Sequence, residues 1–118
     1  MAEIASSKSM DIAIQITPTG LTYALKPVDD QATIVAMYVR WPSYGNLRYP
    51  RSTPAQQSAL ANKLVLRLIS NSAAQTALLA IEEGTSEHRI AATKSAFEQE
   101  HCIVTPQAAH PDGALGLM

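Results

Sequence analysis

The sequence is poor in cysteine and in long apolar runs, and each shortage excludes a class of protein. A single cysteine, Cys102, cannot form an internal disulfide, which excludes a small secreted scaffold held together by disulfides. The apolar runs are only a few residues long, far below the roughly 20 residues that span a bilayer. Residues 1–10 have no apolar core of signal-peptide length. These features predict a domain in a reducing compartment, most simply the cytoplasm, with no membrane partner.

Clustered glycines are also lacking. The five glycines are spread along the chain as Gly20, Gly45, Gly84, Gly113 and Gly116. The sequence therefore contains neither a dinucleotide-binding fingerprint nor a phosphate-binding P-loop, both of which need closely spaced glycines. It also lacks the Gly-x-Ser-x-Gly turn that presents a nucleophilic serine. We expect no cofactor.

The composition is that of a small globular domain. The chain has 118 residues, of which 47% are hydrophobic and 16% charged, so it can build one core but not two ordinary ones. Its net charge of -1 provides no general attraction to nucleic acid or to anionic membranes. We expect a flexible arm over residues 1–9, a single domain over 10–106 and a mobile tail over 107–118.

Alternating apolar residues predict three strands in the first half of the chain. Ile12, Ile14 and Ile16 share one face of the first strand, and a Pro-Thr-Gly turn at 18–20 leads into a second alternating run. The third strand is predicted over 33–41, where β-branched and aromatic residues are frequent.

The second half of the chain has helical periodicity. A capping box from Thr53 to Gln56, with proline at the first helical position, begins a helix with a continuous apolar stripe. A second capping pattern at 72–75 predicts another helix that ends near Gly84, and a third helix is predicted from about 85 to 101. The predicted fold is α+β, with a three-stranded antiparallel sheet followed by three helices on one face. A short final strand is expected near 102–105.

Residues that could carry chemistry are few and poorly placed for it. His88, His101 and Cys102 are too few and unsuitably spaced for a zinc site, which needs three or four converging ligands. The acidic pairs at 29–30 and 82–83 are expected in a turn and at a helix end, where solvated carboxylates are common. We therefore predict no catalytic residue and no metal ligand.

Charge is distributed unevenly despite the small net charge. No acidic residue occurs between Asp30 and Glu82, and that segment carries +5, whereas residues 82–100 carry -3. Arginines and aromatic rings alternate in the segment RWPSYGNLRYPR, which can pair with phosphates, stack on bases or anchor a protein interface. The predicted binding residues are Arg40, Trp41, Tyr44, Arg48, Tyr49 and Arg51. Alternatively, the aromatic rings fill the core and the arginines surround it.

These features favour a small non-enzymatic protein that binds another protein through residues 40–51, as a regulator, inhibitor or accessory factor. The basic segment could also meet the acidic third helix of a second copy in a homodimer. The alternative from another class is a nucleic-acid-binding protein that uses the same segment, whose affinity would fall steeply with salt. A second alternative is a small enzyme whose site is assembled only by the fold.

Overall fold

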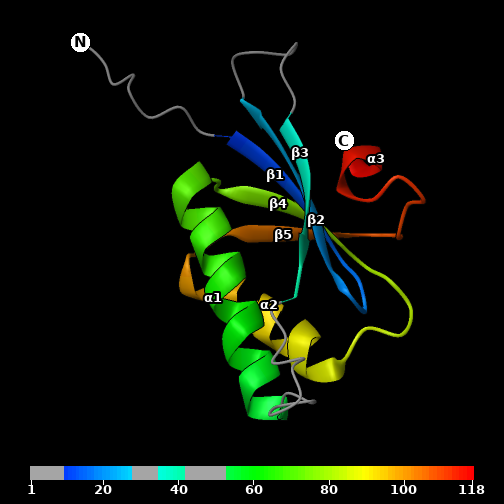
Figure 1. The fold of residues 1–118 in the computed structure, drawn as a ribbon. Helices are drawn as coiled ribbons and strands as arrows, with labels where there is room; N and C mark the ends of the chain where they lie inside the picture. The colour runs from blue at the N-terminus through cyan, green and yellow to red at the C-terminus, as the bar shows by residue number, and fades with distance from the viewer. Residues whose placement is uncertain (1–9, 28–34, 42–52) are drawn as a thin grey trace.

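The computed structural model describes residues 10–27, 35–41 and 53–118, which form one sheet with helices on both faces (Figure 1). The elements in chain order are β1 (Met10–Ile16), β2 (Gly20–Pro27), β3 (Val35–Arg40), α1 (Pro54–Ser72), β4 (Thr76–Ile81), α2 (Glu87–Gln99), β5 (Ile103–Gln107) and α3 (Ala114–Leu117). The predicted arm at 1–9 and residues 42–51 of the predicted binding segment lie outside the described residues. None of the helices in the described part of the chain is long and apolar enough to cross a membrane.

The sheet is mixed and has five strands in the order β3-β2-β1-β4-β5. β2 is antiparallel to both of its neighbours, β1 and β3, whereas β1, β4 and β5 run parallel to one another. Four strands therefore point the same way, and their carboxyl ends lie at one edge of the sheet. The predicted three-stranded antiparallel sheet followed by three helices is thus wrong, although its three strands are present as β1, β2 and β3.

The prediction of the fold failed at residues 72–83, which were expected to form a helix. Ser72 is the last residue of α1 rather than a cap, and Ala73 ends that helix in the left-handed conformation at φ 55°. The next residues form β4, which lies between β1 and β5. Because a central strand is covered on both faces, its run TALLAI is apolar on both sides and does not alternate. Leucine and alanine also favour helix, so local propensity pointed to the wrong structure.

The main core lies between the sheet and the helices α1 and α2. The expected capping box is confirmed, since Thr53 accepts from the backbone of Gln56 and the Gln56 side chain accepts from the backbone of Thr53. The helix-facing side chains of the sheet and of both helices are buried together; they include Ile12, Ile14, Ile16, Leu21, Trp41, Val65, Ile69, Leu79 and Phe97.

The other face of the sheet is covered by the end of the chain. After β5, residues 108–118 cross back over β1 and β2 and end in the short helix α3 (Figure 1). A small second cluster forms there from Ala13, Ala24 and Ala114, with Leu78 and Leu117 at its edge. The small alanine side chains of β1 and β2 allow this close approach. Residues 107–118, the expected tail, thus include the end of β5 and a helix packed on the sheet.

Candidate functional site

A hollow of about 550 Å³ lies at the carboxyl end of β1 and β4. The two strands are parallel and in register from Ile12 to Ile16, so Thr17 and Glu82 follow them at the same edge of the sheet. Ligands of open sheets with parallel strands commonly bind beyond these carboxyl ends. The hollow is lined by Thr17, Pro18, Thr19, Thr22, Tyr38, Glu82, Pro111, Asp112 and Gly113.

A buried glutamine connects two walls of the hollow. Gln15 is 1% exposed and lies on β1 next to the hollow. Its Nε2 donates to Glu82 Oε2 at 2.9 Å and to the His110 carbonyl at 3.0 Å. Its Oε1 accepts from the His110 backbone N–H at 2.8 Å. The end of β4 and the returning C-terminal segment are therefore both fixed to β1 by one side chain.

Asp112 brings a second carboxylate to the hollow from the C-terminal segment. Its backbone N–H donates to His110 Nδ1 at 3.0 Å, and its carboxylate lies 3.9 Å from the same nitrogen while remaining 76% exposed. The backbone N–H of Ala114 donates to Thr22 Oγ1 at 2.8 Å, which holds this segment on β2. Gly113 has φ 68° and ψ -148°, a conformation that is essentially restricted to glycine.

Hydroxyl groups form the remaining polar wall. Thr17 Oγ1 accepts from the backbone N–H of Gly20 at 2.9 Å and closes the turn between β1 and β2. The hydroxyls of Thr19 and Tyr38 are 2.9 Å apart and share a hydrogen bond at the exposed side of the hollow. The site therefore presents two carboxylates and several hydroxyls, a set of oxygen atoms suited to hard cations and to phosphate groups.

The turn beside the hollow is held from the helix side by Trp41 and Arg89. The indole N–H of Trp41 donates to the Thr17 carbonyl at 2.8 Å, and an Arg89 guanidinium N–H donates to the Pro18 carbonyl at 3.1 Å. The Arg89 guanidinium carbon also lies 5.1 Å from the centre of the Trp41 ring, within the range of a cation–π contact. Partial burial lowers the pKa of Arg89. These contacts make the turn a rigid wall.

The structure separates the two described members of the predicted binding set. Arg40 is exposed at the end of β3, whereas Trp41 is 4% exposed and belongs to the core. The other four members, Tyr44, Arg48, Tyr49 and Arg51, lie outside the described residues. The binding role of residues 40–51 therefore stays a prediction.

Sequence reasoning missed Gln15, Glu82 and Asp112. Glu82 was interpreted as a solvated acid at a helix end, but it follows a central strand and is only half exposed. The sequence signal that could have identified Glu82 is a short apolar run followed directly by an acidic residue. Asp112 had no comparable signal, because nothing local shows that residues 108–113 return to β1. Among the described residues, no three His, Cys, Asp or Glu side chains are grouped closely enough to hold a metal ion by themselves.

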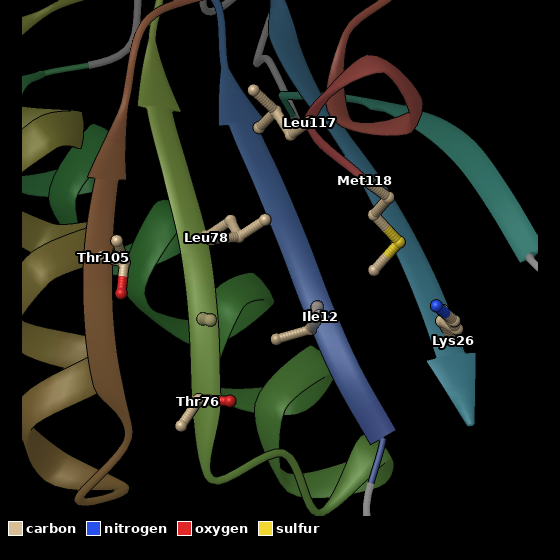
Figure 2. A pocket seen from close by; sticks show the side chains of 8 residues that line it. Ile12, Lys26, Thr76, Leu78, Thr105, Leu117 and Met118 are labelled. Carbon is tan, nitrogen blue, oxygen red and sulfur yellow. The ribbon is translucent and has the colours of Figure 1, made fainter. Parts of the chain in front are cut away.

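A second hollow of about 270 Å³ lies toward the other end of the sheet face on which the C-terminal segment packs (Figure 2). Leu78 comes from β4, while Leu117 and Met118 come from the end of the chain and lie beside β2. Lys26 is its one charged lining residue. Because this hollow is mainly apolar and no acidic side chain lines it, the hollow with Glu82 and Asp112 is the better candidate for chemistry.

No protein-family model matches the sequence, and no curated protein matches it. Solved structures do share the fold. RuvC of Thermus thermophilus in complex with a Holliday junction substrate is 12% identical with a TM-score of 0.62, over 85% of this chain and 64% of that one. Another structure of Thermus thermophilus RuvC is 11% identical with a TM-score of 0.61, over 84% and 63%. The yeast mitochondrial Holliday junction resolvase is 9% identical with a TM-score of 0.56, over 86% and 51%.

The chain therefore has the RuvC-like α/β fold, and it spans less than two thirds of the length of these proteins. The comparison contradicts the expected non-enzymatic regulator, inhibitor or accessory factor, because the similar structures described above are of RuvC and of a Holliday junction resolvase, which are enzymes. The same structures contradict the sequence-based conclusion that the protein is not an enzyme. Nucleic acid, the alternative partner, agrees better with these structures than a regulated protein does.

Proposed function

We propose that this chain is the nuclease domain of an enzyme that binds branched duplex DNA and cleaves it at the acid-lined hollow. One observation carries the proposal. Glu82 and Asp112 line a single hollow at the carboxyl ends of β1 and β4, in a fold shared with a RuvC that was solved on a Holliday junction substrate. The likeness to those structures, at 12% identity or less, supports the fold alone, and the chemistry rests on the side chains that line the hollow.

Cleavage of a phosphodiester in such a site implies a divalent cation. A bound cation polarises the phosphoryl oxygen and stabilises the attacking and leaving oxygens. The hollow offers two carboxylates, one of them half exposed and the other 76% exposed. This set fits Mg²⁺, which is usually held by one or two carboxylates and completed by substrate phosphates and water. Glu82 and Asp112 are the residues that would hold it.

The residues of the hollow would bind and orient the scissile phosphate. The hydroxyls of Thr19 and Tyr38 share one hydrogen bond, and whichever of them accepts in that bond keeps its own O–H free to donate to a phosphate oxygen. The hydrogen bond from Trp41 to the Thr17 carbonyl holds the turn that carries Thr17 and Thr19. Such positioning contributes to phosphoryl chemistry by holding the reacting atoms in line.

The exposed face of β3 extends the hollow toward a DNA backbone. Tyr38 is 52% exposed and lines the hollow, and Arg40 is exposed two residues further along the same strand. Alternate residues of a strand share a face, so these two side chains lie on the same side of the sheet. An exposed ring can stack on an unpaired base, and an arginine can pair with a phosphate. We propose this strip as the path of one DNA arm.

The test compares a labelled four-way junction with a linear duplex that contains the same sequences. Binding is measured by fluorescence anisotropy in EDTA over a series of salt concentrations, and cleavage is measured on gels after Mg²⁺ is added. We expect at least tenfold tighter binding of the junction, an affinity that falls with salt, and cleavage near the branch point. Equal affinity for both DNAs, or an intact junction after prolonged incubation with Mg²⁺, would overturn the proposal.

A further inference from the structure

Gln15 makes an unusual use of a buried polar side chain. It is 1% exposed, and both of its amide atoms are engaged with groups from segments 67 and 95 residues away in sequence. Its side chain hydrogen-bonds both Glu82 and the segment that carries Asp112. A buried amide left without hydrogen-bond partners is costly, so the burial of this side chain depends on these contacts.

The pattern of donors and acceptors defines one orientation of the amide. Nε2 supplies its two N–H groups to a carboxylate and a carbonyl, and Oε1 accepts from a backbone N–H. A flipped amide would place Oε1 against Glu82 Oε2 and against the His110 carbonyl, which are both acceptors. Neither leucine nor methionine can replace these bonds, and asparagine is one methylene shorter. The site therefore requires glutamine at this position.

We propose that Gln15 is a positioning residue that sets Glu82 and Asp112 at the separation at which both carboxylates can hold one divalent cation. Asp112 follows His110 by two residues and is tied to it by its own backbone N–H. Fixing His110 to β1 therefore also fixes the base of Asp112, while the direct bond to Glu82 orients the other carboxylate. The inference rests on the proposed function for the use made of the cation, and on the three hydrogen bonds of Gln15 for the positioning.

A purely structural role would make a different prediction. If Gln15 served only to pack the C-terminal segment, replacing it would lower the melting temperature and leave cation binding by the folded protein unchanged. A positioning role predicts that cation affinity and turnover fall in the folded protein, while the affinity for DNA in EDTA stays the same. These two outcomes are measured on the same variant.

The variant is Gln15→Met, which keeps the approximate volume and removes all three hydrogen bonds. Its control is Ser72→Ala, because Ser72 is also buried and hydrogen-bonded, donating to the Ile69 carbonyl at 3.0 Å, but lies at the end of α1 away from the hollow. Mn²⁺ alone is titrated into each ¹⁵N-labelled protein, and paramagnetic broadening of the amide signals around residues 82 and 112 is followed by NMR. Gln15→Asn carries the same test if the methionine variant does not fold.

We expect both groups of signals to broaden at one midpoint in the wild-type protein and in Ser72→Ala. In Gln15→Met the midpoint should rise at least tenfold, and kcat for the junction should fall with the DNA affinity in EDTA unchanged. An unchanged Mn²⁺ midpoint in Gln15→Met would overturn this inference alone. No Mn²⁺ binding by the wild-type protein would overturn the proposed function together with it.

Discussion

The two faces of β1 differ although the same seven residues form them. Toward α1 and α2, the strand presents Ile12, Ile14 and Ile16, all at most 1% exposed in the main core. Toward the C-terminal segment it presents Ala13 and Gln15, which are equally buried but small or polar. The first face contributes stability through apolar burial. The second accepts a close backbone and organises a polar hollow, so equal burial on the two faces serves different purposes.

The largest expected effect is a loss of activity from a substitution on the face toward the C-terminal segment. Glu82→Gln keeps the shape of the side chain but removes a charge that would hold the cation, so cleavage of the junction should fall about a hundredfold or more. The matched control is Glu83→Gln, which removes the same charge from an exposed neighbour outside the hollow. Rates are measured by single-turnover gel assays. Equal losses in the two variants would show that general charge, not the hollow, is responsible.

The helix-covered face should respond in stability instead. Ile14→Ala removes a fully buried side chain from the main core and should lower the free energy of unfolding by about 2–5 kcal/mol. Ala13→Val, on the other face of the same strand, adds volume beneath the C-terminal segment and should cost about 1–3 kcal/mol. Urea unfolding followed by circular dichroism measures both. A larger loss from Ala13→Val would reverse the assignment of the two faces.

Gly113→Ala tests how tightly the C-terminal segment packs on its face of the sheet. The backbone conformation there costs a non-glycine residue about 1–3 kcal/mol. The added Cβ would also lie 2.7 Å from Thr22 Oγ1. We expect faster hydrogen exchange over residues 110–118 and weaker cleavage, with the core amides still protected. The control is Gly84→Ala. Gly84 also has a positive φ, but a Cβ added there would meet only Pro18, at 3.4 Å. Similar exchange over 110–118 in both variants would exclude the close contact as the cause.

The smallest effect concerns Cys102, which belongs to the helix-covered core. Burial raises the pKa of its thiol, and the charge of Glu100 raises it further. The unfolded chain therefore releases this proton at lower pH than the folded protein does, so stability is retained below about pH 9 and decreases as the pH rises above it. Cys102→Ala should flatten this decrease. Urea midpoints from pH 7.5 to 10 measure it, and parallel curves for the two proteins would contradict the assignment.

Local patterns predicted part of the fold well. The alternation in β1 and β2 and the capping box of α1 are visible over a few neighbouring residues, because pleat and cap geometry relate residues two or three positions apart. β4 could not be found this way, since a strand covered on both faces has no alternation and its leucines and alanines suit a helix. The predicted fold class was wrong because this one strand was missed: β4 pairs in parallel with β1 and β5 and makes the sheet mixed.

The candidate site could not be predicted from local sequence patterns, for a different reason. Gln15, Glu82 and Asp112 come from three segments, and the residues between them give no sign that the segments meet. By itself, the sequence determined where the first strands and the first helix form and how charge is distributed along the chain, since these depend on neighbouring residues. Only the tertiary structure decided that two parallel strands and a returning segment bring two carboxylates to one hollow, because that proximity arises from packing between residues distant in the chain.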